Sequence, residues 1–220
     1  MEPTKARSAV VIGVGPGIGG AVARRFAREG LSIALVARRP EVLAAVAETL
    51  DTFAAPTMCL TADSTDETSL RAALDKAAGE LGDPDVVVYN AAMIRRDQPG
   101  ELSTEGHLHA WAVNVGGALT AAAHVLPTMA LRGSGSFLIT GGMPAPDPDY
   151  TSLSLGKAGV RALVSLLDLR YRPAGVHLAT VTVAGAVAPG TAFDPDHIAE
   201  HYWHLHNQPP DHWQREIVHH

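Results

Sequence analysis

The sequence predicts one α/β domain with a doubly wound parallel sheet of about seven strands and helices on both faces. Short runs rich in β-branched residues alternate with longer segments rich in Ala and Leu. A glycine-rich turn joins the first of these runs to the first helical segment. No internal repeat or low-complexity linker divides the sequence, so we expect a single domain over residues 1–220.

Strands and helices are expected in alternating order. The strand-like runs cover 8–14, 31–37, 56–63, 84–92, 135–142 and 176–185. The helical segments cover 18–30, 40–50, 66–82, about 106–131 and 155–169. Gly30 and Gly82 are natural helix stops, and Pro40 suits a first helical turn. After residue 194 we expect one more helix and a short strand near 215–220.

Composition excludes several classes of protein. The 46% of hydrophobic residues indicates a globular chain, and a net charge of -6 without a basic run argues against nucleic acid as a partner. No apolar run has membrane-spanning length, and the N-terminal residues lack a secretory pattern, so we expect a cytoplasmic protein. A single cysteine, Cys59, provides neither an internal disulfide nor a cysteine-based metal site.

The glycine turn is the first candidate for ligand binding. The residues GVGPGIG at 13–19 follow a strand and open a helix, as a dinucleotide-binding turn of the Rossmann fold requires. Gly13 can adopt the tight turn. Gly17 has no Cβ, so a pyrophosphate can approach the backbone there. The helix N-terminus then offers free N–H groups. The candidate cofactor-binding residues are Gly13, Gly15, Gly17, Ile18 and Gly19. An ordinary tight turn is the alternative.

The end of the second strand predicts which nucleotide is bound. An acidic residue there would bind the ribose 2′-hydroxyl of NAD, but this chain has Arg38 and Arg39. Guanidinium groups suit a 2′-phosphate because they form two parallel hydrogen bonds with it. We therefore predict NADP as the cofactor. The alternative is a solvated basic pair with no ligand.

These motifs together resemble the short-chain dehydrogenase/reductase family from Ser8 to about Thr191. The family's TGxxxGxG turn is matched by residues 12–19, with Ile12 in place of the threonine. Asp63 matches an aspartate that contacts adenine in the family, and Asn90 lies in a YNAA sequence that resembles the family's NNAG. The resemblance implies cofactor contacts for both residues.

The resemblance extends to the catalytic region. Asn114 matches an asparagine that holds a water and a helix kink, and Lys157 matches the lysine that binds the nicotinamide ribose. Thr191 is implied as a contact of the nicotinamide amide. The resemblance therefore implies roles for Asn114 and Lys157 in catalysis and for Lys157 and Thr191 in cofactor binding.

Two positions depart from the family pattern. The family's catalytic tyrosine, four residues before the lysine, maps to Leu153, and the catalytic serine maps to Gly142. A carbonyl reduction needs a proton donor as well as a hydride donor, and loss of a positioned acid costs about 10²–10⁴-fold in rate. We expect either a non-standard proton donor or a different function.

Several groups are candidates for that donor. Tyr150 lies seven residues before Lys157 and shares its helix face if the helix begins early, although the loop 144–150 is expected to delay the start. Tyr150 is otherwise a loop-packing residue. A water held by Asn114 and Lys157 is a second candidate. Lys157 itself is a third, if burial lowers its pKa, although a structural contact to ribose is its simpler role. Ser152 and Ser154 flank Leu153, and one of them is expected to cap the helix.

The histidine-rich tail is the last unusual segment. His197, His201 and His204 would share one helix face, but three ligands along a straight helix are too far apart for one ion, so we predict no metal site. We expect 192–220 to form a lid over the substrate or an oligomer contact, through Tyr202, Trp203 and Trp213. His219 and His220 are read as the start of a purification tag.

Three functions fit the sequence. The first is an NADP(H)-dependent oxidoreductase of a small carbonyl, alcohol or activated alkene, with a non-standard proton donor. The second is an NADP-binding regulatory or partner subunit without redox activity, and the third is an isomerase or cyclase on the same fold. A small molecule is the expected substrate, with neither nucleic acid nor membrane as a partner. The resemblance and the apolar helices 106–131 and 155–169 indicate a homodimer or homotetramer.

Overall fold

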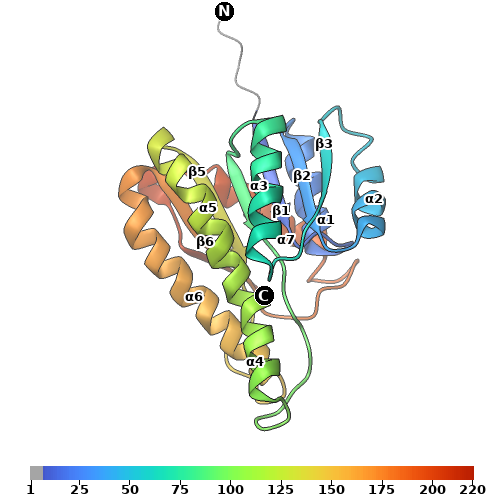
Figure 1. The fold of residues 1–220 in the computed structure, drawn as a ribbon, viewed down its shortest axis with the longest axis vertical. Coiled ribbons are helices and arrows are strands. Elements are labelled where there is room, and N and C mark those ends of the chain that lie inside the picture. Colours follow the sequence, from blue (N-terminus) through green and yellow to red (C-terminus); the bar gives the residue numbers. More distant parts are fainter. Residues whose placement is uncertain (1–6) are drawn as a thin grey trace, which may run out of the picture.

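The computed structural model describes residues 7–220 and contains one seven-stranded sheet in the order β3-β2-β1-β4-β5-β6-β7 (Figure 1). Every neighbouring pair of strands is parallel. The strands are β1 (Ser8–Ile12), β2 (Ser32–Ala37), β3 (Thr57–Thr61), β4 (Val86–Tyr89), β5 (Gly135–Thr140), β6 (Val176–Val183) and β7 (Glu216–His219). The strand order reverses between β1 and β4, as in a doubly wound Rossmann fold, which confirms the predicted fold class.

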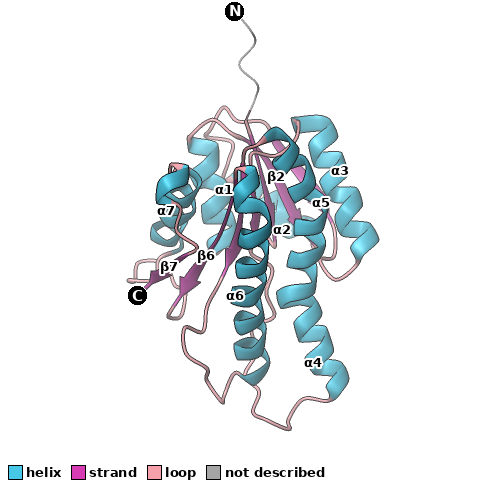
Figure 2. Cartoon of the chain, turned by 90° about the vertical axis from the view of Figure 1, so that its left-hand side faces the viewer, coloured by secondary structure: helices cyan, strands magenta, loops and turns pink. Residues whose placement is uncertain are grey.

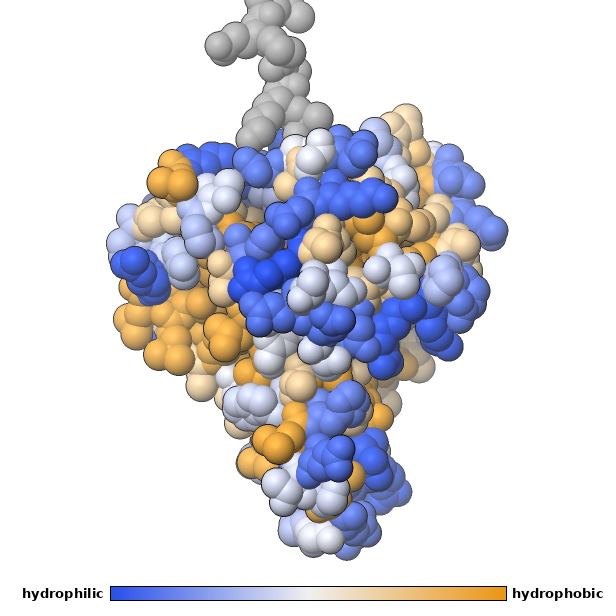
Figure 3. Space-filling model, in the orientation of Figure 1, coloured by the Kyte–Doolittle hydropathy of each residue, from blue (hydrophilic) through white to orange (hydrophobic). Residues whose placement is uncertain are grey.

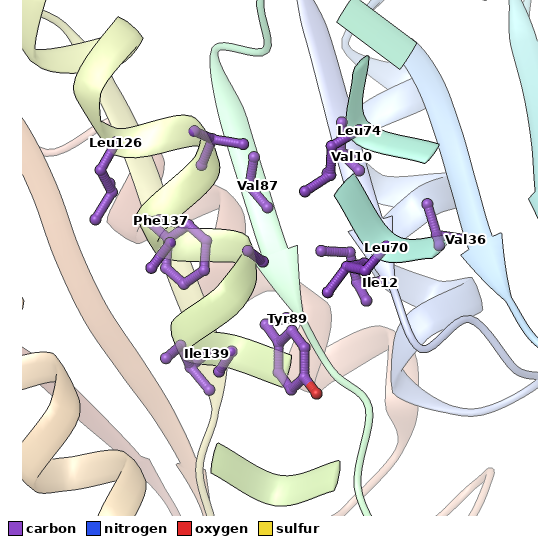
Figure 4. Packing of buried hydrophobic residues seen from close by; sticks show 14 of the residues in the cluster. Val10, Ile12, Val36, Leu70, Leu74, Val87, Tyr89, Leu126, Phe137 and Ile139 are labelled. Atoms are coloured by element: carbon purple, nitrogen blue, oxygen red, sulfur yellow. The ribbon is translucent and has the colours of Figure 1, made fainter. Parts of the chain in front are cut away.

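Helices cover both faces of the sheet (Figure 2). They are α1 (Ile18–Arg28), α2 (Pro40–Glu48), α3 (Glu67–Leu81), α4 (Thr104–Trp111), α5 (Gly117–Arg132), α6 (Thr151–Tyr171) and α7 (Pro195–His206). Successive strand residues point to opposite faces, so the strands contribute to two separate cores. Val10 and Val36 pack with α3, α5 and α6, as Figure 4 shows in part, whereas Val11 and Leu35 pack with α1, α2 and α7.

The long helix predicted over 106–131 is interrupted. A π-helical turn, Ala112–Gly116, separates α4 from α5 and contains Asn114. The Tyr89 hydroxyl at the end of β4 donates a 2.6 Å hydrogen bond to the Val113 carbonyl within this turn. Figure 4 shows the Tyr89 ring in the core with its oxygen at the lower end. Single π turns mark functional sites in many helices, and this one is fixed to the strand that ends at the cavity described below.

Helix α6 begins four residues earlier than the predicted start at Leu155. The carboxylate of Asp97, from the loop after β4, accepts hydrogen bonds from the Ser152 backbone N–H at 3.0 Å and the Ser152 hydroxyl at 2.8 Å. Asp97 is only 1% exposed and caps the helix from a distant segment. The loop 144–150 therefore does not delay the helix, because the missing cap comes from 55 residues earlier in the chain.

The C-terminal segment does not cover the site as a lid. Helix α7 packs on α1, and Tyr202 is fully buried in the core below the sheet. Trp213 stacks on His177 with 4.9 Å between ring centroids. His219 belongs to β7 and pairs with Val183. The prediction of a lid is wrong because α7 has a hydrophobic face that α1 and β6 bury.

In residues 7–220, no helix is long and apolar enough to cross a membrane.

We predict that Tyr202→Phe lowers the free energy of unfolding by about 1 kcal/mol, the typical value of one buried hydrogen bond. The Thr140 hydroxyl donates to the Asn90 side-chain oxygen, so the Tyr202 hydroxyl donates to Thr140, at 2.7 Å. Chemical denaturation would measure the change. Tyr171→Phe is the matched control, because no hydrogen bond of the Tyr171 hydroxyl is present in the described structure. Equal stability of the two variants would contradict this contribution.

Candidate functional site

A cavity of about 1170 Å³ lies at the carboxyl ends of the strands. Residues at or just after the ends of β1, β2, β3, β4, β5 and β6 line it, and so does the first part of α6. Ligands of doubly wound sheets bind at this edge, next to the point where the strand order reverses. The sequence-predicted residues that line the cavity are Gly13, Gly17, Ile18, Arg38, Arg39, Asp63, Asn90, Tyr150 and Lys157.

The glycine turn forms one wall of this cavity. Gly13 has φ +85°, and a Cβ there would lie 2.2 Å from the Ala91 nitrogen, so only glycine fits. Gly17 precedes α1, and no atom lies within 4 Å of the position that its Cβ would occupy. No side chain caps α1, although Asp66, Ser103 and Asp194 cap α3, α4 and α7. The first N–H groups of α1 therefore remain available to an anion in the cavity.

Two arginines and an aspartate line the cavity after β2 and β3. Arg38 and Arg39 are exposed, and the Arg39 guanidinium lies 3.9 Å from the Glu41 carboxylate. The Asp63 carboxylate accepts hydrogen bonds from the Thr65 N–H at 2.9 Å and the Thr65 hydroxyl at 2.8 Å. The bond from the Thr65 N–H is the main reason that the pKa of Asp63 is lowered, and Arg38 contributes to the same direction. Both charge signs are thus present at this part of the cavity.

Asn90 and Thr140 form a buried hydrogen-bonded connection between neighbouring strands. The Asn90 amide nitrogen donates to the Gly13 carbonyl at 2.8 Å, and its oxygen accepts from the Thr140 hydroxyl at 2.8 Å. The Asn90 side chain therefore holds the glycine turn to β4 and β5. Sequence reasoning missed Thr140 and its partner Tyr202, because their hydroxyls meet only across the sheet.

Lys157 brings an amine to the cavity wall. Its side chain projects from α6, is 5% exposed, and donates a 2.6 Å hydrogen bond from Nζ to the Thr140 carbonyl. The pKa of Lys157 is lowered to about 8, mainly by burial and in part by the neighbouring Arg161 guanidinium. An amine with this pKa exchanges a proton readily near neutral pH, which an ordinary lysine with a pKa of 10.5 does not.

Tyr150 and Leu153 line the cavity beside Lys157. Tyr150 directly precedes α6, where the Asp97 cap fixes the first turn, and the Arg96 guanidinium carbon lies 6.0 Å from its ring centroid. Leu153 is 6% exposed and presents only carbon atoms. The early helix start, which the sequence did not predict, brings Tyr150 to the same wall as Lys157.

Four predicted site residues do not line the cavity. Gly15 and Gly19 belong to the turn, and a Cβ on Gly19 would lie 2.9 Å from the Gly13 carbonyl oxygen, so Gly19 serves helix packing. Asn114 is buried, and its oxygen accepts a 2.9 Å hydrogen bond from the Met93 N–H. The Thr191 hydroxyl donates to the Ala188 carbonyl at 2.8 Å and organises its own loop.

Arg161 and Met143 are further residues of the site that the sequence did not reveal. Arg161 lies one turn after Lys157 and donates 3.1 Å hydrogen bonds to the carbonyls of Gly142 and Met143. Met143 has φ 48°, a left-handed conformation that is uncommon outside glycine. Arg161 lies four residues after Lys157, a spacing that indicates the same face of the helix. Its backbone partners lie in the loop after β5, and the sequence does not indicate them.

The histidines of α7 do not gather around an ion. No group of three or more His, Cys, Asp or Glu side chains that could hold a metal occurs within residues 7–220. His201 forms a 2.9 Å hydrogen bond with His219 of β7, and His204 lies 3.1 Å from the Gln208 amide nitrogen.

Comparison with known proteins gives the family. The family model described as short chain dehydrogenase matches residues 7–195. The chain belongs to the short chain dehydrogenase family. Among its relatives, oxidoreductase UcpA of Escherichia coli (strain K12) is 29% identical over 89% of this chain and 73% of the relative. The cis-4-hydroxycyclohexanecarboxylate dehydrogenase of Sinomonas cyclohexanicum is 31% identical over 86% of this chain and 74% of the relative.

Solved structures resemble this protein over nearly the whole chain. An alcohol dehydrogenase from the archaeon Thermococcus sibiricus, complexed with 5-hydroxy-NADP, has a TM-score of 0.87 and 27% identity, covering 96% of this chain and 95% of its own. A short-chain dehydrogenase from Rhodopseudomonas palustris has the same TM-score with 22% identity, covering 98% of both chains.

Proposed function

We propose that this short chain dehydrogenase is an NADP(H)-dependent oxidoreductase that acts on a small carbonyl, alcohol or activated alkene, and that Lys157 supplies the proton. The observation that carries the proposal is that one cavity holds both an uncapped helix N-terminus beside Gly17 and a buried amine with a pKa of about 8. The structure of the alcohol dehydrogenase relative with 5-hydroxy-NADP supports the choice of cofactor.

The residues present fit NADP. The α1 N–H groups and the open space at Gly17 suit the diphosphate, and Arg38 and Arg39 suit a 2′-phosphate. Asp63 would contact the adenine, and Lys157 would also contact the nicotinamide ribose. When bound, NADPH supplies a hydride to the substrate carbon. The other steps depend on the residues of this chain.

The proton comes from the Lys157 ammonium in this scheme. Leu153 and Gly142 stand where the resemblance placed the family's catalytic tyrosine and serine, and neither can donate a proton. As the substrate C=O bond becomes C–O, its oxygen takes a proton from Nζ and becomes a hydroxyl, leaving a neutral amine that regains its proton from water. The Thr140 carbonyl holds Nζ in place by the 2.6 Å hydrogen bond. Asn114 positions the π turn, and Tyr150 packs beside the substrate.

We predict that Arg38→Ala raises the Kd for NADPH by about tenfold or more, because one charge-assisted contact to phosphate contributes about 1.5–3 kcal/mol. The Kd for NADH, which lacks the 2′-phosphate, should change little. Fluorescence titration with both nucleotides would measure this. Arg28→Ala is the matched control, because Arg28 is also an exposed arginine and does not line the cavity. An equal loss of affinity for NADPH and NADH would contradict the role of Arg38.

We predict that the rate of carbonyl reduction at saturating NADPH is constant well below pH 8 and falls as pH rises through about 8. The pKa of Lys157 is lowered to about 8, so the ammonium that donates the proton is lost above that pH. Lys157→Met should lower turnover about 10²–10⁴-fold and abolish this pH dependence. Absorbance at 340 nm with aldehydes, ketones and activated alkenes would follow turnover.

The matched control is Tyr150→Phe, which should retain the same pH profile. A Tyr150→Phe variant without turnover would assign the donor role to the tyrosine instead. Retained NADPH binding with no turnover of any compound would favour the cofactor-binding function without redox activity.

We also propose that the chain forms a homodimer or homotetramer through the outer face of α5 and α6. Leu166 and Leu169 are 66% and 75% exposed on α6, and Leu131 is 91% exposed on α5. Figure 3 shows hydrophobic surface gathered over this part of the molecule. A contiguous apolar patch of this kind marks a protein interface.

We predict that Leu166→Glu combined with Leu169→Glu converts the oligomer to a monomer, because a carboxylate cannot be buried there without a partner. Analytical ultracentrifugation would measure the change. Val218→Glu is the control, since Val218 is exposed on β7, away from these helices. An unchanged sedimentation coefficient of the double variant would contradict this interface.

A further inference from the structure

One part of the cavity is built almost entirely from apolar residues of three loops. Ile94 follows β4, Met143 to Pro146 follow β5, and Val187 follows β6. We call these residues the apolar wall. Ile94 is 73% exposed and Val187 is 39% exposed, although both border one cavity together. Exposed apolar side chains that converge on a cavity from separate loops indicate a ligand with an apolar surface.

The charges of the cavity are unevenly distributed. Arg38, Arg39 and Asp63 follow β2 and β3, where the nucleotide is proposed to bind. Among the lining residues that follow β4, β5 and β6, including α6, Asp147 and Lys157 carry the charges. The Lys157 ammonium is engaged with the Thr140 carbonyl and the reacting oxygen, so an anionic substituent would find no further cation among these lining residues. The Asp147 carboxylate would repel it.

The apolar wall is fixed before any ligand binds. The Arg161 guanidinium donates to the carbonyls of Gly142 and Met143 and holds Met143 in its left-handed conformation. At the other end of the same loop, the Asp149 carboxylate pairs with Arg96 at 2.9 Å and accepts from the Gln98 amide at 3.0 Å. A loop anchored at both ends presents a preformed surface, which reduces the entropy lost when a ligand binds.

We infer that the substrate is an uncharged carbonyl compound with an apolar aliphatic or alicyclic body, which packs on the apolar wall while its oxygen meets Lys157. This inference rests on the proposed function for the reacting group. It adds a selection against anions: a carboxylated ketone would lose its hydration at the wall and face Asp147 without gaining an ion pair.

The test compares two ketones of similar size, 4-methylcyclohexanone and 4-oxocyclohexanecarboxylate, with the NADPH-loaded protein at pH 7. The neutral ketone is expected to have a kcat/KM at least about tenfold higher, since a desolvated and unpaired carboxylate costs more than that factor. An equal or higher kcat/KM for the anionic ketone would overturn the inference and leave the proposed oxidoreductase function standing.

A charge added to the wall provides a second measurement. Val187→Arg is expected to lower the ratio of the two kcat/KM values about threefold, the size of one partly exposed ion pair. Val218→Arg is the matched control, because Val218 is 37% exposed on β7 and does not line the cavity. A ratio that changes equally in both variants would overturn the assignment of Val187 to the substrate wall.

The two proposals fail in different ways. If neither these ketones nor any compound of the panel above is turned over, the oxidoreductase function fails, and calorimetric titration of the NADPH complex with each ketone then tests the binding preference alone. Tighter binding of the neutral ketone would support the apolar wall even without turnover. Tighter binding of the anionic ketone would overturn it.

Discussion

The site depends on Thr140, the last residue of β5. Its carbonyl accepts the Lys157 ammonium at 2.6 Å, and its hydroxyl donates to Asn90, which in turn holds the Gly13 carbonyl. This connection joins the carboxyl ends of β1, β4 and β5 to α6. The Tyr202 hydroxyl donates to Thr140 and so links α7 to the same connection. Because Thr140, Lys157 and Tyr202 are buried, removing one of these partners would leave a polar atom of another without its hydrogen bond.

Local chemistry explains which features were predictable from the sequence. The alternation of strands and helices follows from hydrophobic periodicity, and the glycine turn is marked by Gly13, which takes a positive φ. The positions of Lys157 and Asn90 at the site followed from the family resemblance, which relates positions across the whole chain. The prediction that Arg38 suits a 2′-phosphate required only its position after β2. Each of these features depends on a short segment or on a motif of fixed spacing.

The features that the sequence missed depend on distant partners. The cap of α6 comes from Asp97, so no residue near 150 signals the early helix start. The resemblance implied a helix kink at Asn114, but not that Tyr89 of a distant strand holds the π turn there. The fate of Tyr202 shows the same limitation. An aromatic residue in a polar, histidine-rich segment looked like part of a lid, but its hydroxyl finds Thr140 through the sheet, and that partner makes full burial possible.

The surroundings of Lys157 disfavour its charged form. Within the described residues its Nζ donates to the Thr140 carbonyl, and Leu153, one helical turn earlier, brings only carbon atoms to the same cavity. Desolvation is the main cause of the lowered pKa of Lys157. Arg161 acts in the same direction, and its two bonds to the loop after β5 keep its charge near the amine. Burial and the Arg161 charge thus both lower the pKa of this amine, and its proposed role as proton donor depends on that pKa.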